Sequence, residues 1–304
     1  GARGGLTMLD QVEAFFALLE RFKRYWRKKA QPPEPETLAG RFLRLFAAHG
    51  VHANQIPRFF GHGLALRDVQ SAQALARCLT DEHLAAACEL FGVRRSWLER
   101  GEGQAHEVHH FYLQPEGFGT FLDALPALRQ QQGEHMWAKL FMAGRGARNE
   151  ESVLLLEEPV GELNEDVIYR RHYIDAGPLS YWKARVSTTA LLAQLLRRKV
   201  WVQGRECEPG WVAKLFQTKD LLTVQDLDDL YTRSHRVEVD DWLLEPDALL
   251  EGIDPERNQF GAQSALQLWL DLDARGLMRM EFTRPDTRQR FEERLQRVFS
   301  TAAS

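Results

Sequence analysis

The 304-residue sequence predicts a multidomain α+β protein, and three observations carry this prediction. Short amphipathic helices separated by glycines fill residues 37–104. Strand-like runs around one strong helix fill residues 108–216. Helical spacing then returns over residues 217–304. Helices followed by a strand-rich region and further helices indicate α+β architecture, and the length suits two or three domains.

Residues 1–36 divide into three parts. Residues 1–7 (GARGGLT) precede Met8 and are interpreted as an expression scar. Residues 8–30 predict an amphipathic helix with cations at its C-terminal end, and residues 31–36 (QPPEPE) predict a stiff linker. The apolar stripe of this helix needs a partner surface in the same chain or a second copy, and we expect a homodimer. Contact of its basic end with phosphates or an anionic membrane surface is the less favoured alternative.

Five short helices are predicted within residues 37–104. Gly50 and Gly92 end two of them, as glycines past helix ends commonly do. Thr80 is a good N-cap for the fourth helix, and Val69 is the expected buried residue of the third. The helices are expected at 38–49, from 52 or 53 onward, at 66–75, at 81–91 and at 95–100.

The most specific pattern closes this region. Residues 84–103 read LAAACELFGVRRSWLERGEG, which is an apolar helix, a Leu-Phe-Gly-Val turn, a Trp-Leu pair and a Gly-x-Gly exit. Gln55, Ile56 and Gly61 provide a glutamine, a core aliphatic residue and a turn glycine before it. This pattern resembles the lambda-repressor-like (Cro-type, XRE) helix-turn-helix family over the first third of the chain. The resemblance implies an all-α DNA-binding domain over residues 37–104.

In that family the exposed face of the third helix enters the major groove, where Arg and Gln pair with guanine and adenine edges. The resemblance implies base contacts from Arg67, Gln70, Ser71 and Gln73, and phosphate contacts from Arg58, Arg77, Arg94 and Arg95. Pro57 and a long turn after Gly61 depart from the family pattern, and Asp68 would face phosphate. These departures favour the alternative, an interaction or scaffold protein that keeps a degenerate helix-turn-helix fold.

Residues 108–216 predict an antiparallel sheet of four or five strands with one or two helices, loosely PAS-like by analogy. Strands are expected at 108–114, 153–157, 167–174 and 200–206, and a helix at 187–199. Aromatic residues on these elements form a candidate pocket for a small-molecule effector, although aromatic residues on strands more often belong to the core. They are Trp137, Tyr169, Tyr173, Trp182 and Trp201.

The remaining residues predict helices at 224–233, 240–251, 264–275 and 287–299. Asp226, Asp228 and Asp229 begin an acidic patch that we interpret as a solvated face, because its spacing does not match a calcium-binding loop. The net charge of −4 is unevenly divided: residues 1–104 hold 15 Lys and Arg against 11 Asp and Glu. A basic first third and an acidic remainder suit a protein that meets nucleic acid at one end.

The sequence carries no motif of the common hydrolase, metalloprotease, nucleotide-binding or deaminase sites, and we predict neither an enzyme nor a cofactor. His106, His109 and His110 lack further ligands at zinc spacing, so no metal site is expected. The three cysteines include no CxxC pair and no apolar run is long enough to span a bilayer, which favours a cytoplasmic protein. We therefore expect a dimeric transcription regulator that binds duplex DNA and whose body senses an effector or contacts a protein partner.

Overall fold

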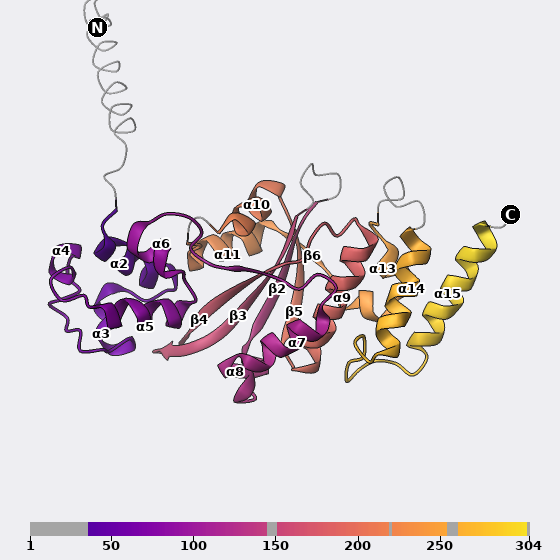
Figure 1. Ribbon diagram of the computed structural model, residues 1–304, viewed down its shortest axis with the longest axis horizontal. Helices are drawn as coiled ribbons and strands as arrows, with labels where there is room; N and C mark the ends of the chain where they lie inside the picture. Colours follow the sequence, from indigo (N-terminus) through magenta and orange to yellow (C-terminus); the bar gives the residue numbers. More distant parts are fainter. Residues whose placement is uncertain (1–35, 145–150, 219–220, 254–260, 303–304) are drawn as a thin grey trace, which may run out of the picture. The chain divides into compact units, whose positions relative to one another are not determined.

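The computed structural model describes residues 36–144, 151–218, 221–253 and 261–302 (Figure 1). The residues interpreted as an expression scar, the helix predicted at 8–30 and residues 31–35 of the linker lie outside the described residues. Leu38–Ser304 form one compact unit, in which a run of helices precedes a six-stranded mixed sheet and more helices follow it. The predicted α+β class is confirmed.

The helices before the sheet, which we call the helical head, enclose an aromatic core. Phe46 lies 5.1 Å from Phe60 and 5.0 Å from Phe91 between ring centroids, both in edge-to-face geometry. Gly92 ends one helix in the left-handed conformation, at a φ of 66°, where a glycine has no Cβ to clash. The elements are α2 (Leu38–Ala48), η1 (Ala53–Gln55), α3 (Ile56–Phe59), α4 (Ala72–Leu75), α5 (Asp81–Phe91) and α6 (Arg95–Arg100).

The third helix of the head is shorter than predicted. Helical structure expected over 66–75 is confined to α4, although Val69 is buried as expected. Two side chains compete with the helix: Asp68 Oδ2 accepts a hydrogen bond from the Ala65 amide, and Ser71 Oγ accepts one from the Ala74 amide. Ser71 is extended, so it caps a new helix instead of continuing one. The prediction of a continuous helix here was wrong.

The sheet is mixed, where an antiparallel sheet was predicted. Its order is β1-β4-β3-β2-β5-β6, with β1 parallel to β4 and β5 parallel to β2. The chain crosses from β4 to β5 through the long helix α9 (Trp182–Arg197), and a crossover of this kind lets β5 run parallel to β2. The strands are β1 (Val108–His110), β2 (Trp137–Ala143), β3 (Ser152–Leu163), β4 (Asp166–Asp175), β5 (Trp201–Cys207) and β6 (His235–Val237).

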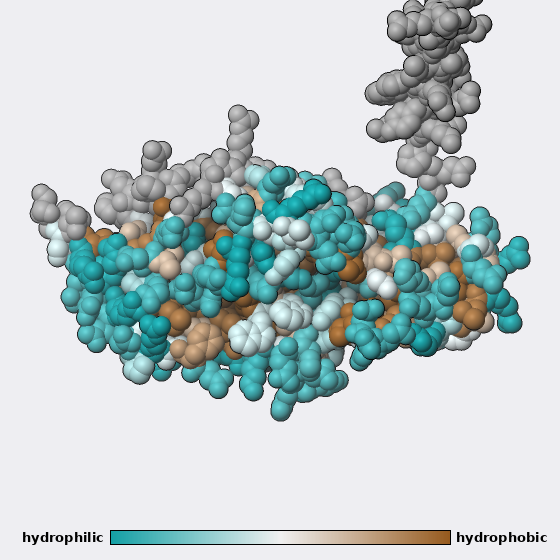
Figure 2. Space-filling model, turned by 180° about the vertical axis from the view of Figure 1, so that it is seen from behind, coloured by the Kyte–Doolittle hydropathy of each residue, from teal (hydrophilic) through white to brown (hydrophobic). Residues whose placement is uncertain are grey.

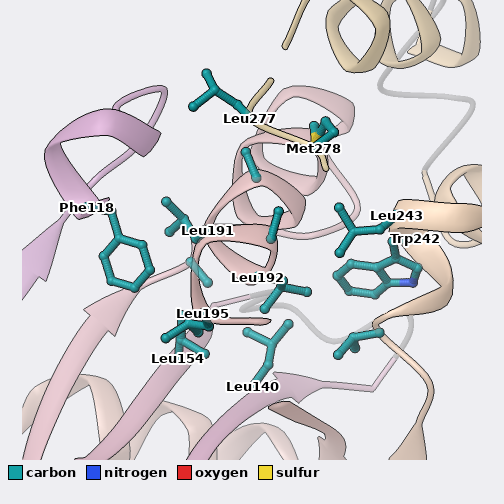
Figure 3. Packing of buried hydrophobic residues seen from close by; sticks show 14 of the residues in the cluster. Phe118, Leu140, Leu154, Leu191, Leu192, Leu195, Trp242, Leu243, Leu277 and Met278 are labelled. Atoms are coloured by element: carbon teal, nitrogen blue, oxygen red, sulfur yellow. The ribbon is translucent and has the colours of Figure 1, made fainter. Parts of the chain in front are cut away.

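Helices cover both faces of the sheet (Figure 1). On one face Leu140 and Leu154, paired in register on β2 and β3, lie beneath Leu191 and Leu195 of α9 (Figure 3). The next pair along, Phe141 and Val153, points to the other face because side chains alternate along a strand. That second face packs against α10 (Pro209–Gln217) and α11 (Val224–Arg233).

The hairpin of β3 and β4 carries two buried acidic residues that point to opposite faces. Glu157 lies opposite Arg171 on the paired strand and forms an ion pair with Lys139, with 2.5 Å between Lys139 Nζ and Glu157 Oε2. Glu158 lies opposite Arg170 and accepts a hydrogen bond from His172 Nε2 at 2.9 Å. Buried carboxylates are tolerated when charged donors surround them, so this pairing holds the hairpin in one register.

The tip of the same hairpin enters the core of the helical head. Leu163 and Ile168 are buried among the apolar side chains of the head. The Phe59 ring packs so closely against Gly161 that a Cβ added at this glycine would lie only 2.6 Å from the ring. Arg170 Nε donates to the Leu90 carbonyl at the end of α5, at 3.0 Å. The tip of the β3–β4 hairpin is therefore part of the apolar core of the head.

The C-terminal helices extend the core on the side of α9 that faces away from the sheet (Figure 1). Trp269 and Phe291 stack with ring centroids 3.7 Å apart and join two of them. Among the described helices none is long and apolar enough to cross a membrane, and the face in Figure 2 is mostly hydrophilic with separate hydrophobic areas. The elements are α12 (Asp241–Leu244), α13 (Pro246–Leu250), α14 (Gly261–Ala274) and α15 (Thr287–Ala302).

Three short elements, α7 (Pro115–Ala124), α8 (Pro126–Arg129) and η2 (Gly133–His135), connect β1 to β2. At Gly133 an added Cβ would lie 1.9 Å from the Arg198 carbonyl oxygen just past α9, a contact that no relaxed structure holds. We expect Gly133→Ala to lower the free energy of unfolding by about 1–3 kcal/mol in urea denaturation, because backbone has to move. Gly210→Ala is the matched control.

In that control the Cβ would meet no described atom within 4 Å, and Gly210 lies inside α10. Alanine stabilises a helix over glycine by up to about 1 kcal/mol, so the control should be neutral or stabilising. Equal stability of the two variants would contradict the close packing of η2 against the end of α9.

Candidate nucleic-acid interface and ligand cavity

All four side chains predicted to contact bases lie exposed on one segment of the head. Arg67 lies in a turn with its side chain 85% exposed, and Gln70 in a bend before α4. Ser71 is the N-cap of α4, and Gln73 lies within α4. Leu66 is also exposed on this segment, at 59%, although helical spacing would have buried it with Val69. An exposed apolar side chain among donors suits the methyl group of thymine.

Asp68, the carboxylate within this segment, is mostly buried and engaged by its neighbours. Its Oδ2 accepts from the Ala65 amide at 2.8 Å, and its side chain is only 21% exposed. Its Oδ1 lies 3.7 Å from Arg67 Nε, and the Arg67 side chain is nevertheless 85% exposed to solvent. The carboxylate that would repel phosphate is therefore engaged by its own turn.

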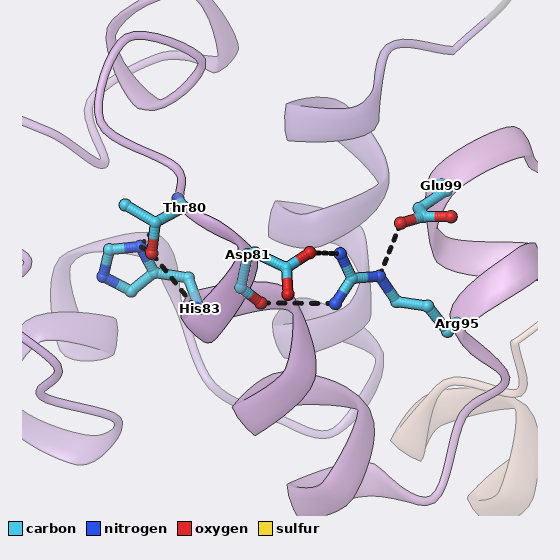
Figure 4. Close-up of polar contacts among 5 residues, drawn as sticks. All are labelled: Thr80, Asp81, His83, Arg95 and Glu99. Atoms are coloured by element: carbon cyan, nitrogen blue, oxygen red, sulfur yellow. Dashed lines mark hydrogen bonds and ion pairs between the residues drawn. The ribbon is translucent and has the colours of Figure 1, made fainter.

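A histidine of α5 holds the turn from which the segment departs. His83 Nε2 lies 2.8 Å from the His62 carbonyl. Its Nδ1 lies 3.0 Å from the Thr80 amide (Figure 4). This pattern fits the tautomer in which Nε2–H donates and Nδ1 accepts. His62 has a positive φ of 51°, an uncommon conformation for a non-glycine residue that this bond stabilises.

The predicted phosphate-contact residues differ in how far they are engaged. Arg58 is exposed and donates through Nη2 to Asn164 Oδ1 at 3.0 Å, a neutral partner that leaves its charge unopposed. Arg77 and Arg94 are exposed, and neither makes an ion pair within the described residues. Arg95 instead lies between the Asp81 and Glu99 carboxylates, with Nε 2.6 Å from Glu99 Oε1 (Figure 4). Arg95 therefore offers the least charge to a phosphate.

Two of the five aromatic residues proposed for a pocket do line one cavity, of about 640 Å³. They are Trp137 and Tyr169; burial raises the pKa of Tyr169, and a hydrogen bond from Trp137 partly offsets the rise. Tyr173 is instead buried in the core of the second sheet face. Trp182 packs at the edge of the α9 core, and Trp201 is 59% exposed beside Trp137 in register.

Charged residues that sequence reasoning did not select also line this cavity. Glu158 is buried at 1% exposure, accepts from the Ala127 amide at 3.1 Å, and lies 3.7 Å from Arg170 Nη1. Burial alone would raise the pKa of Glu158, but bonds from His172 and the Ala127 amide, with the Arg170 charge, lower it. The facing runs LEEP and YRRH were the available signal, but only the register of β3 and β4 shows which residues meet.

The three neighbouring histidines predicted not to bind metal have separate environments. His106 Nδ1 lies 3.1 Å from the Gly92 carbonyl, and His109 packs 4.9 Å from the Phe121 ring. His110 Nδ1 lies 3.0 Å from Asp175 Oδ2. Within the described ranges, no group of three His, Cys, Asp or Glu residues is placed to hold a metal ion.

Comparison with known proteins adds no identification: no family model, no curated protein and no solved structure matches this chain.

Two buried histidines at the joint of head and sheet make stability depend on pH. Burial, with a smaller contribution from Arg171, lowers the pKa of His49; the pKa of His106 falls to about 3, again mainly through burial. The unfolded chain takes up these protons below pH about 6.5 and the folded chain does not. Stability is thus full above that pH and declines as pH falls toward 3.

We expect each histidine to remove about 1.4 kcal/mol of unfolding free energy per pH unit below about 6.5. Urea denaturation at pH 7 and pH 5 measures the loss. His106→Asn, which can still donate to the Gly92 carbonyl, should show a smaller loss than the parent protein. Identical losses in the two proteins would contradict a buried neutral His106.

Proposed function

We propose that the protein is a sequence-specific DNA-binding transcription regulator of the cytoplasm, acting as a homodimer. The helical head would bind duplex DNA, and the body would sense a small molecule or mediate assembly. One observation carries the proposal: the segment 66–73 exposes hydrogen-bond donors suited to base edges, while its single carboxylate, Asp68, is mostly buried and bonded to the Ala65 amide. The family resemblance of residues 37–104 supports it.

The chemistry of the segment fits direct readout of bases. A guanidinium such as that of Arg67 pairs with the O6 and N7 of guanine, and amides such as those of Gln70 and Gln73 pair with adenine. Arg58, Arg77 and Arg94 would position the duplex through its phosphates. Arg95, held by two carboxylates, would serve to fix α6 against α5 instead.

A second candidate function, a scaffold or interaction protein that does not bind DNA, is favoured by the length of α4. A single turn, Ala72–Leu75, is a short element to insert into a major groove, and Pro57 occupies the first turn of α3. Binding of random duplex DNA at low salt separates the two functions. A protein that binds no duplex at 50 mM salt would exclude the regulator and leave the scaffold.

Substitution of a base-contact residue should relax specificity. With duplexes selected from a random pool, Arg67→Ala or Gln70→Ala should cost about 1–3 kcal/mol at one base position and little on unrelated duplexes. Fluorescence anisotropy on the selected duplex and on single-base variants measures this. A uniform loss across all duplexes would show that these side chains contact only the backbone.

Substitution of a phosphate-contact residue should weaken all duplexes alike. Arg77→Ala and Arg94→Ala should each reduce the slope of log K against log salt by about 1. Arg233→Ala, an exposed arginine at the end of α11, removes the same charge from the body and serves as the control. Equal slopes of log K against log salt for the Arg77, Arg94 and Arg233 variants would show that Arg77 and Arg94 do not contact the DNA.

A further inference from the structure

The tip of the β3–β4 hairpin, an element of the sheet, reaches the helical head (Figure 1). Leu163 on β3 pairs with Asp166 on β4, and a turn of two residues, Asn164 and Glu165, connects them. Leu163 is buried among the apolar side chains of the head. The turn is therefore held at the surface of the head by the residue that precedes it.

A depression of about 480 Å³ lies between this turn and the segment 66–73. Leu66 lines it from the segment, Arg58 from α3 and Asn164 from the turn. The other lining residues are Asn54, Gln55 and Pro57. The major groove of a duplex is about 12 Å wide, so a duplex that lies against Leu66 would also span the depression and meet Asn164.

The chemistry of the depression is complementary to a nucleic-acid backbone. Arg58 supplies the one charge among the residues that line it. The Arg58 Nη2 donates to Asn164 Oδ1 at 3.0 Å, and an amide oxygen orients a guanidinium without neutralising its charge. The other polar lining groups are side-chain amides, which donate hydrogen bonds to phosphate and sugar oxygens in protein–DNA complexes.

Asn164 is suited to hold Arg58 because its own backbone is fixed. It has a positive φ of 58°, a conformation that asparagine adopts more readily than most residues. The buried Leu163 before it holds the turn in place. A guanidinium that is oriented in advance loses less side-chain freedom when it meets a phosphate.

Carboxylates mark the limit of this surface. Glu165 and Asp166 follow Asn164 and are exposed, and Glu162 lines a neighbouring depression of about 370 Å³ that also includes Arg58 and Asn164. None of these three carboxylates lines the depression beside Leu66. A phosphate placed beyond the turn would be repelled by them, so contact with the backbone would end at Arg58.

We propose that the tip of the β3–β4 hairpin completes the DNA interface, with Asn164 positioning Arg58 for a phosphate of the duplex. This role rests on the proposed function, because it adds a residue to the same interface. Asn164 lies 106 residues after Arg58 in the sequence, outside the region that resembles the helix-turn-helix family. The sheet would thus take a direct part in DNA binding.

Two substitutions of Asn164 separate the position of Arg58 from its charge. Asn164→Gly tolerates the positive φ and removes the acceptor. It should weaken all duplexes about three- to tenfold, the cost of ordering one long side chain, and leave the slope of log K against log salt unchanged. Asn164→Asp keeps the acceptor but neutralises Arg58, so the slope should fall by about 1. Fluorescence anisotropy of the full chain at several salt concentrations measures both.

Gln131 provides matched controls on the body. It also carries an amide side chain, has a positive φ of 59° and is exposed. Gln131→Gly and Gln131→Glu make the same two changes outside the depression, and each should alter DNA affinity less than about twofold, because salt screens exposed charges. Melting curves establish that every variant folds.

A double substitution tests whether Asn164 acts through Arg58. In an Arg58→Ala background, Asn164→Gly should cost less than about twofold in affinity, because the guanidinium that it positions is gone. An equal loss in the Arg58→Ala background and in the parent protein would overturn the positioning role.

The outcomes separate this role from the proposed function. A parent protein that binds duplex DNA while the folded Asn164→Gly variant binds it equally well would overturn the role of the hairpin tip alone. An Asn164→Asp variant with the salt slope of the parent protein would do the same. A parent protein that binds no duplex at low salt would overturn the proposed function and the role of the tip together.

Discussion

The pairing of Glu157 and Glu158 with Arg171 and Arg170 is the constraint on which the structure depends. Consecutive strand residues point to opposite faces, so each carboxylate needs its own basic partner on its own side of the sheet. A register slip of one residue would leave buried charges unpaired. Removing one member of a buried ion pair costs about 3–5 kcal/mol, so the hairpin has a single stable alignment.

That alignment also determines where the head attaches. The hairpin tip delivers Leu163 and Ile168 to the head, and the same strands deliver Arg170 to the end of α5 and Glu158 to the cavity. The register of one strand pair therefore sets the position of the apolar contacts, the polar link and the candidate ligand site together.

The sequence predicted best where the signals are local. The start of α5 at Thr80 and its end at Gly92 follow from a cap and a left-handed glycine, each readable within a few residues. The prediction of the third helix was wrong because the Asp68 and Ser71 side chains accept hydrogen bonds from neighbouring backbone amides. The spacing of apolar residues does not reveal such bonds. The parallel strands could not be predicted, because β2 and β5 pair although they lie about 60 residues apart in the sequence. The cavity could not be predicted either, because strand pairing alone brings Trp137 and Tyr169 to its lining.

The presence of the hairpin tip in the core of the head has a consequence for how the chain is divided. A fragment ending at residue 104 would lack Leu163, Ile168 and Leu221, and so would present to water the apolar surface that these side chains cover. The helical head is thus not an independent domain that could be moved to another protein. Whatever it binds, it binds with the hairpin tip and Leu221 in its core.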